Sequence, residues 1–406
     1  MSMLRPVEAI RADFPAFEST AGEAPPARFD GPGGTQVPRL VIDAVADYLA
    51  RHNANAHWHF PASERTDALV AAAREAFAAF VGGGPDEIVF GPNMTSLAMH
   101  VARGLGRQWV AGDEVVVTGL DHHANVAPWE ALVVERGVVL RWWEADPETG
   151  ALDLEDLPPL LSGRTRLVAL GGASNALGTL SDIAATARVA HAHGALLFVD
   201  AVHLAAHRSL DVTASGADLL ACSPYKFYGP HAGVLWCRRE LLEAIEAPRL
   251  RPAPSTGPER LQTGTPSFEA IAGGAAAVHW LASLTDAPGG MRDRLVATFT
   301  ALAAREMALF AHLWDGLGQI DGLRRFGLPP GPGRTATVSC TLAGEAPLAT
   351  AARLARHGIS ASHGNFYALT AAERAGVHPD GWLRLGISAY TTHDEVDRAL
   401  AALAAR

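Results

Sequence analysis

Two patterns of apolar and polar positions alternate along the chain from about residue 86 onward. Short apolar runs rich in Val, Ile and Leu predict buried strands, and the segments between them have the periodicity of helices. The predicted strands are 87–90, 114–118, 138–143, 166–170, 195–199, 218–222 and 233–237, with helices beginning near residues 95 and 125 and covering 181–193. Strands that alternate with helices predict an α/β fold with a mostly parallel sheet.

The pattern changes after residue 245. A proline-rich stretch at 247–259 is followed by predicted helices at 270–285 and 290–317. Shorter elements come next, at 335–342 (strand), 348–357 (helix), 382–388 (strand) and 393–405 (helix), and two earlier helices are predicted at 38–51 and 64–81. We therefore predict a large domain, residues 36–285, and a smaller α+β domain made of residues 1–35 and 286–406.

The composition describes a globular protein and removes several function classes. The 406 residues are 49% hydrophobic and 19% charged, which disfavours disorder. A net charge of −10 without a basic stripe disfavours nucleic-acid binding. The sequence has neither an 18-residue apolar run nor the apolar core of a signal peptide, so we expect a cytoplasmic protein without membrane contact.

Cysteines and adjacent histidines give weak signals. Cys222, Cys237 and Cys340 are too few for a disulfide framework and form no CxxC pair. His122 and His123 are adjacent, but no third ligand is spaced near them, so we predict no metal site. The glycine-rich run at 29–38 lacks the strand and helix context of a dinucleotide-binding fingerprint.

One lysine stands among many arginines. Of 33 basic residues, 32 are arginine and only Lys226 is lysine. A genome rich in G and C explains the arginines, and chance survival is one explanation of the lysine. The other is chemical, because an ε-amine can be tuned to act as a nucleophile or form a Schiff base, and a guanidinium cannot.

Polar residues collect where the predicted strands end. Lys226 follows the strand 218–222, and Asp200 follows the strand 195–199, with His203 three residues later. Thr95 opens a helix after a Gly-Pro-Asn turn, where free N–H groups can bind phosphate. Taken alone, Asp200 could pair with an arginine and Thr95 could be a simple cap. Together these residues can hold pyridoxal 5′-phosphate (PLP), with a Schiff-base lysine, a carboxylate for the pyridine nitrogen and a phosphate cup.

Five segments carry a family resemblance. VDAVH, CSPYKFYGP, DHHANVAPW, SNALGT and TGTPSF resemble the class V aminotransferase family, and within it the cysteine desulfurase-like branch. The resemblance is densest between about residues 86 and 270. It implies the PLP-dependent transferase fold-type I, a seven-stranded large domain with a small C-terminal domain, and a homodimer with active sites at the interface.

The resemblance also implies a role for each matching residue. Lys226 matches the Schiff-base lysine, Asp200 the partner of the pyridine nitrogen, and His122 the histidine that stacks on the ring. His203 stands where the family usually has a glutamine that bonds the ring hydroxyl. The remaining cofactor-binding matches are Met94, Thr95, Ser223, Tyr225 (in place of a histidine) and Thr265, which reaches the cofactor of the partner subunit. Asn175 and Arg384 match residues that bind the substrate carboxylate.

The sequence departs from this branch at one loop. A cysteine desulfurase needs a loop cysteine that takes up sulfur as a persulfide, but in GISASHGNFYALTA the corresponding residue is Tyr367. Ser362 replaces an arginine of the same loop. Persulfide-forming desulfurase activity is therefore in doubt.

These observations predict a PLP-dependent enzyme acting on a small α-amino acid through an external aldimine and Cα deprotonation. Desulfurase-like or β-elimination chemistry is the first expectation. A class V aminotransferase or an epimerase is the alternative, and a non-catalytic PLP-binding partner of a desulfurase is an alternative of another class. The sequence leaves open which amino acid is the substrate and which bond breaks after deprotonation.

Overall fold

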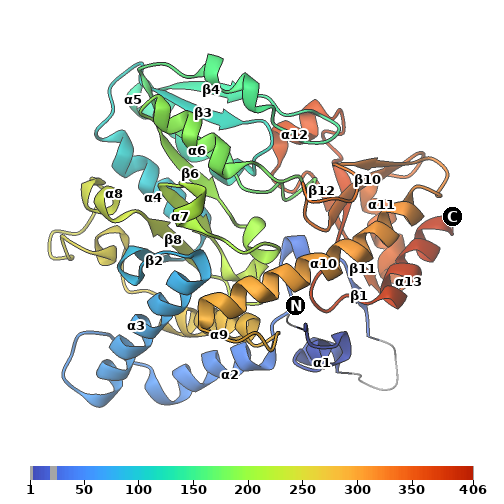
Figure 1. Cartoon of the computed structure of the whole chain (residues 1–406), viewed down its shortest axis with the longest axis horizontal. Helices are drawn as coiled ribbons and strands as arrows, with labels where there is room; N and C mark the ends of the chain where they lie inside the picture. Colours follow the sequence, from blue (N-terminus) through green and yellow to red (C-terminus); the bar gives the residue numbers. More distant parts are fainter. Residues whose placement is uncertain (1–2, 19–24, 406) are drawn as a thin grey trace.

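A seven-stranded sheet forms the centre of the protein in the computed structural model, which describes residues 3–18 and 25–405 (Figure 1). The strand order is β2 (Ile88–Gly91), β8 (Gly233–Cys237), β7 (Leu219–Cys222), β6 (Leu196–Asp200), β5 (Thr165–Gly171), β3 (Glu114–Thr118) and β4 (Val139–Trp143). β8 is antiparallel to both neighbours, and the other pairs are parallel. The predicted α/β fold with a mostly parallel sheet is confirmed, and each predicted strand is present within a few residues of its expected bounds.

Helices cover both faces of the sheet, which explains why its strands are apolar on both sides. Along β3, Val115 and Val117 belong to one apolar cluster and Val116 to the other. The first cluster includes residues of α4 (Met94–Gly106), α5 (Ala127–Arg136) and α8 (Arg239–Ala244). The second includes residues of α3 (Pro61–Val81), α6 (Ile183–Ala192), α7 (Val212–Ser215) and α9 (Phe268–Ala282). α2 (Arg39–Asp47) packs on α9 and continues as a π-helical turn at Tyr48–His52.

A smaller antiparallel sheet lies beside the large one. Its strand order is β12 (Ser362–Gly364), β13 (Trp382–Gly386), β10 (Thr337–Leu342) and β9 (Leu323–Phe326). α11 (Pro347–Arg356) and α13 (His393–Ala404) pack on it, and β1 (Ala27–Arg28) pairs in parallel with β11 (Ile359–Ser360). The long helix α10 (Met291–Leu317) runs from beside α9 to beside α13 and so joins the two parts (Figure 1).

The sequence pattern misses several short elements. β9 contains two arginines in four residues and β12 reads Ser-His-Gly, so neither has an apolar face that periodicity could detect. α1 (Val7–Arg11) and α12 (Leu369–Arg374) are shorter than two helical turns. Near the N-terminus, Phe14 packs edge-on against both Trp280 and Tyr390, so this segment touches both parts of the molecule. The predicted domain bounds stay a prediction.

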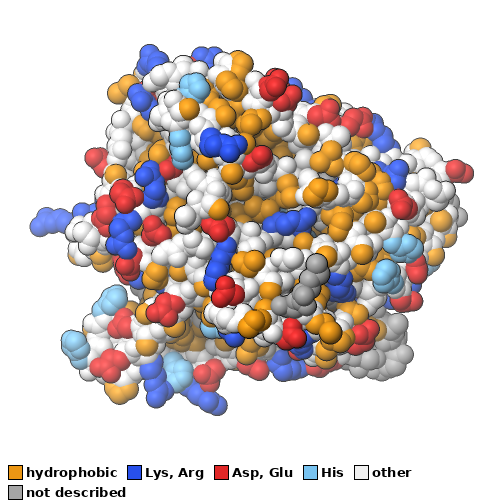
Figure 2. Space-filling model, viewed as in Figure 1, with side chains coloured by type: hydrophobic (Ala, Val, Ile, Leu, Met, Phe, Trp, Pro, Cys, Tyr) orange, Lys and Arg blue, Asp and Glu red, His pale blue; other side chains and the backbone are white. Residues whose placement is uncertain are grey.

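The surface carries charged side chains of both signs. Figure 2 shows acidic and basic side chains interspersed over this face, without a continuous basic area. Among the described residues no helix is long and apolar enough to cross a membrane. Within residues 3–18 and 25–405, no group of three or more His, Cys, Asp or Glu side chains could hold a metal ion.

Candidate active site

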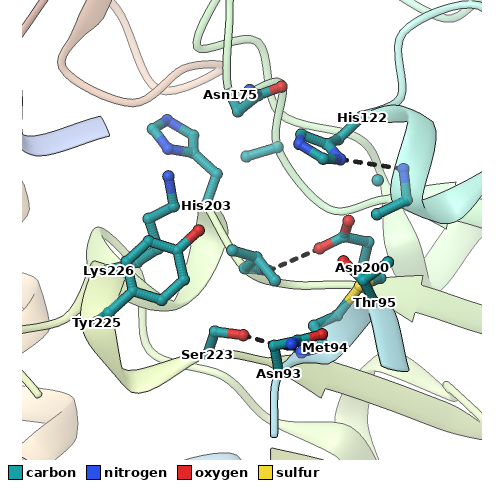
Figure 3. Close-up of a pocket in the computed structure, with 14 residues that line it drawn as sticks. Asn93, Met94, Thr95, His122, Asn175, Asp200, His203, Ser223, Tyr225 and Lys226 are labelled. Carbon is teal, nitrogen blue, oxygen red and sulfur yellow. Dashed lines mark hydrogen bonds between the residues drawn. The ribbon is translucent and has the colours of Figure 1, made fainter. Parts of the chain in front are cut away.

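One pocket lies at the carboxyl ends of the parallel strands, where ligands of α/β sheets bind (Figure 3). It brings together every site residue predicted from the sequence except Arg384 and Thr265. Its lining residues are Asn93, Met94, Thr95, His122, Ala124, Gly171, Ala173, Asn175, Asp200, Val202, His203, Ser223, Tyr225 and Lys226. Ser223 and Met94 lie at one end of the pocket in this view, and Asn175 lies at the opposite end (Figure 3).

Lys226 is held in the short turn that follows β7. The turn covers Pro224–Lys226, and the lysine is 8% exposed. Its Nζ donates a hydrogen bond to the carbonyl of Pro32. Burial, and then the charge of Arg384, lower the pKa of Lys226 to about 7, and the charge of Asp200 opposes both. Because part of the amine is neutral at physiological pH, Lys226 can act as a nucleophile or a base.

Asp200 is the last residue of β6 and is 7% exposed. Its Oδ1 accepts a hydrogen bond from the Val202 N–H at 2.9 Å. Burial raises the pKa of Asp200 to about 6, and the Val202 N–H and Lys226 oppose that shift. The carboxylate faces the pocket, where a cationic ring nitrogen would offset the cost of its burial.

The end of the pocket near Ser223 is built from the start of α4. The side chain of Asn93 caps the helix and accepts from the Ser96 N–H at 2.8 Å, while the Met94 N–H donates to Ser223 Oγ at 3.1 Å. Thr95 lies exposed in this first turn. A helix N-terminus flanked by hydroxyls favours an anion, so this end suits a phosphate group.

Tyr225 lies beside this end with its ring stacked on His231 at 4.9 Å and 10°. Burial, followed by the charge of Asp200, raises the pKa of Tyr225. Its phenol therefore stays protonated and can donate a hydrogen bond.

Both pocket histidines are neutral near pH 7. The Nδ1 of His122 accepts from the Ala124 N–H at 3.0 Å, which assigns the proton to Nε2. Burial lowers the pKa of His122 to about 4, with Lys226 adding to the effect. Burial also lowers the pKa of His203, whose Nε2 lies 3.0 Å from the hydroxyl of Thr335.

Arg384 lies next to the pocket, on β13, and is 3% exposed. Its Nη1 donates to the carbonyl of Asn175 at 2.7 Å, and its guanidinium lies 3.8 Å from the centre of the Phe366 ring. Arg384 Nε and Asn175 Oδ1 are buried and have no hydrogen-bond partner. The Arg384 Nε–H can donate to a carboxylate, whereas Asn175 Oδ1 can only accept and suits a donor group of a ligand.

Thr265 is a predicted site residue that lies outside this pocket. It is exposed and lines a separate cavity together with Gly91, His231 and neighbouring residues of the 262–267 segment. The role predicted for it, contact with the cofactor of a partner subunit, stays a prediction.

The loop after β12 contacts the pocket residues His122 and Asn175 through Tyr367 and Phe366, which have positive φ angles of 60° and 56°. The carbonyl of Tyr367 accepts from the His123 N–H at 2.7 Å, and its ring lies 5.2 Å from that of His122. The carbonyl of Phe366 accepts from the Asn175 amide at 2.9 Å.

No thiol replaces the missing loop cysteine. Cys222, Cys237 and Cys340 are all free and buried, and none lines the pocket. Burial raises the pKa of each of them, to about 12 for Cys340. None of the three is therefore a reactive thiolate.

Sequence reasoning assigned no role to two contributors to this site. Asn93 caps α4, and the Asn-x-x-Ser spacing before a helix was a signal that could have found it. Asp121 is buried beside the pocket, but in the sequence it is only one residue of the DHHANVAPW motif. Its contacts depend on the packing of β3 against β5 and on η5 (His123–Asn125), and periodicity cannot supply such contacts.

Comparison with known proteins identifies the family. The family model for class-V aminotransferases matches residues 28–399. The chain belongs to the class-V aminotransferase family. Enzymes of this family depend on PLP, so PLP is the cofactor of this enzyme, and the predicted family, enzyme class and cofactor are confirmed.

Individual relatives narrow the branch. A probable cysteine desulfurase of Pseudomonas aeruginosa is 33% identical over 97% of this chain and 96% of its own length. A cysteine desulfurase of Pectobacterium atrosepticum is 32% identical over 99% of this chain and 98% of its own. Among solved structures, the apo cysteine desulfurase of Thermococcus onnurineus superposes with a TM-score of 0.90 at 27% identity, covering 100% of this chain and 98% of that one. The class-V enzyme described here is thus cysteine desulfurase-like.

Proposed function

We propose that this class-V enzyme catalyses β-elimination from cysteine or a similar small α-amino acid with a sulfur leaving group at Cβ. Relatives named as cysteine desulfurases support the substrate class. The observation that carries the reaction type is the loop, where Tyr367 takes the place of a nucleophilic thiol while the three cysteines are buried elsewhere. Sulfur then leaves without first bonding to the chain. The overall reaction converts cysteine and water into pyruvate, ammonia and hydrogen sulfide.

The pocket offers a partner for each part of the cofactor. In this proposal Lys226 would bind the aldehyde carbon, Asp200 would pair with the ring nitrogen, and His122 and His203 would contact the ring and its hydroxyl. The start of α4, with Met94, Thr95, Ser223 and Tyr225, would hold the phosphate. When bound, PLP supplies an electron-accepting ring that stabilises negative charge at the substrate Cα.

The side chains of the protein supply binding and proton transfer. Lys226, with a pKa of about 7, would act as the base that takes the proton from the substrate Cα. Arg384 offers its guanidinium fork to the substrate carboxylate, and Asn175 lies beside it. Loss of the carboxylate contact should therefore act mainly on substrate binding.

Product analysis tests this function. Incubation of the PLP-loaded enzyme with cysteine should give sulfide and pyruvate in equal amounts. Alanine together with a persulfide on the protein would instead mean desulfurase chemistry. A 2-keto acid that forms only with an amino acceptor would mean transamination, and inverted amino acid would mean epimerisation. If the protein binds PLP but turns over no amino acid, the remaining hypothesis is a non-catalytic PLP-binding partner of a desulfurase.

The carboxylate subsite gives a narrower prediction. Arg384→Ala should raise KM for cysteine by about 10- to 100-fold, because a charge-assisted bidentate contact contributes on the order of 1.5–3 kcal/mol. An unchanged KM would place the carboxylate elsewhere.

We further propose that the active form is a homodimer in which Thr265 reaches the cofactor of the partner subunit. Exposed apolar side chains on and after α2 support an interface, namely Leu40, Ile42, Leu49, Trp58 and Phe60. Mixing inactive Lys226→Ala with impaired Thr265→Ala should restore part of the activity, since one site of each mixed dimer has both residues intact. No recovery in verified mixed dimers, or a monomeric active enzyme, would contradict the proposal.

A further inference from the structure

A second buried carboxyl, Asp121, lies behind the pocket and has no part in the reaction described above. It follows β3 closely and is 4% exposed. One oxygen accepts from the Gly171 N–H at 2.6 Å, and the other accepts from the Asn125 amide at 2.7 Å. Gly171 pairs with Asp200 in the register of β5 and β6, so the two carboxyls approach the same point of the sheet edge.

The backbone is shaped for this close approach. A Cβ placed on Gly171 would lie 2.4 Å from Asp121 Oδ1, so any other residue would displace the carboxyl. The fully buried hydroxyl of Thr118 also hydrogen-bonds the Asp121 carboxyl and accepts from the Leu120 N–H at 3.2 Å. The Gly171 and Asn125 N–H groups only donate, but a hydroxyl can accept as well as donate, so Thr118 can accept the proton of a neutral carboxyl.

The surroundings of the two carboxyls differ in charge. Among the described residues no lysine, arginine or histidine forms an ion pair with Asp121, whereas Lys226 faces Asp200. Two uncompensated negative charges at one buried point would repel each other. Burial, and then the charge of Asp200, raises the pKa of Asp121 to about 8, above the value of about 6 for Asp200, and outweighs the hydrogen bonds from Asn125, Thr118 and Gly171, which lower it.

We propose that Asp121 is a positioning residue that holds a proton at neutral pH, so that Asp200 alone carries the negative charge that faces the ring nitrogen. The inference rests on the proposed role of Asp200 in binding that nitrogen. A neutral Asp121 fixes the place of the charge and holds Gly171 at the wall of the pocket. At higher pH a second charge appears behind Asp200, and its repulsion disfavours the folded site.

Stability against pH tests the protonation. A carboxyl with a folded pKa above its unfolded value takes up a proton on folding, so its contribution falls as pH rises from about 4 to about 8. In urea titrations of the full chain with PLP, Asp121→Asn should lack this decline. Its unfolding constant should therefore fall relative to that of the native sequence by up to about 10-fold per pH unit between pH 5 and 8.

Asp113→Asn provides a matched control at the other end of β3. Asp113 is 2% exposed and pairs with Arg166, and these contacts lower its pKa. The difference between this variant and the native sequence should stay constant from pH 5 to 8. Parallel curves for Asp121→Asn over the same range would overturn the proposal.

Infrared spectroscopy gives a second readout that does not depend on unfolding. At pH 7 the native holoenzyme should show the carbonyl band of a protonated carboxyl. The band should be absent from Asp121→Asn and retained in Asp113→Asn, and its absence from the native enzyme would overturn the proposal. The proposed function fails in a different way, namely when no elimination products form. That outcome does not depend on the infrared and stability results, which test only the protonation of Asp121.

Discussion

Buried carboxyl groups at the two ends of the large sheet have pKa shifts of opposite direction. Asp113 and Asp121 flank β3 and are similarly buried, at 2% and 4% exposed. Burial alone would raise the pKa of Asp113, but Arg166, the Val110 N–H and the charge of Arg164 together outweigh it and lower that pKa. Burial and the charge of Asp200 raise the pKa of Asp121 to about 8. Neighbours, and not burial itself, decide the sign of the shift.

This difference distinguishes charges that stabilise the fold from charges that are available for catalysis. At the amino ends of the strands, Glu114 binds Arg141 and Asp218 binds both Arg238 and His191. At the carboxyl ends, the charges of Asp200 and Lys226 face a pocket. Pocket groups that have a shifted pKa and a charge that the protein does not fully compensate are the ones with which a ligand can pair. The next four predictions test this contrast, from the largest expected effect to the smallest.

Lys226→Ala should abolish turnover, with a loss of at least about 10³-fold, because it removes both the covalent attachment point and the base. It should also raise the pKa of Asp200 further, since the lysine charge opposes the shift caused by burial. Loss of the visible absorbance of lysine-bound PLP would report the first effect. A variant that keeps this absorbance would remove the assignment of Lys226.

Asp200→Asn should lower kcat on the order of 10²-fold, because a neutral amide cannot hold a proton on the ring nitrogen as a carboxylate does. Stability at pH 7 should change little, since the amide avoids the cost of burying a charge. Steady-state kinetics and urea unfolding of the same preparation measure the two effects. If stability fell instead of activity, Asp200 would resemble the structural carboxylates at the opposite end.

Asp113→Asn should show the reverse pattern. It removes a buried charge that Arg166 and the Val110 N–H compensate, so we expect a loss of about 1–3 kcal/mol in the free energy of unfolding. Turnover measured well below the unfolding temperature should remain near that of the native enzyme. A large fall in kcat would mean that the amino ends of the strands also influence the chemistry.

The sequence predicts this contrast only in part. Strand runs such as ALLFVD and DLLAC predict the sheet and place Asp200 and Lys226 at one edge, because parallel strands end together. The sequence does not reveal that Arg166 reaches Asp113, or that Gly171 and Asn125 enclose Asp121, because strand pairing and loop packing decide these contacts. Arg384 was identified only through the resemblance, because its strand belongs to the other sheet.

Arg141→Ala should have the smallest effect on stability. It tests whether several contacts together stabilise each buried carboxylate at the amino ends of the strands. Glu114 is buried, and the hydrogen bond from Ser162 at 2.6 Å is the first cause that lowers its pKa; burial opposes it, and Arg141 adds to it. A carboxylate with a lowered pKa stabilises the fold above its unfolded pKa and loses that contribution as pH falls. Arg141 is half exposed, so its removal should cost only about 0.2–1 kcal/mol at pH 7.

The same variant should respond to acid in a defined direction. Without Arg141 the pKa of Glu114 rises toward its ordinary value, so the difference from the native sequence should shrink as pH falls below about 4.5. Urea midpoints at pH 7 and at pH 4 measure this change. In the variant Ser162 still donates to Glu114. Acid should therefore not remove the stabilisation from this hydrogen bond at the same pH at which the difference due to Arg141 disappears. A difference that stays the same at pH 4 would mean that Arg141 stabilises the edge strand by packing along β4 and not by its charge.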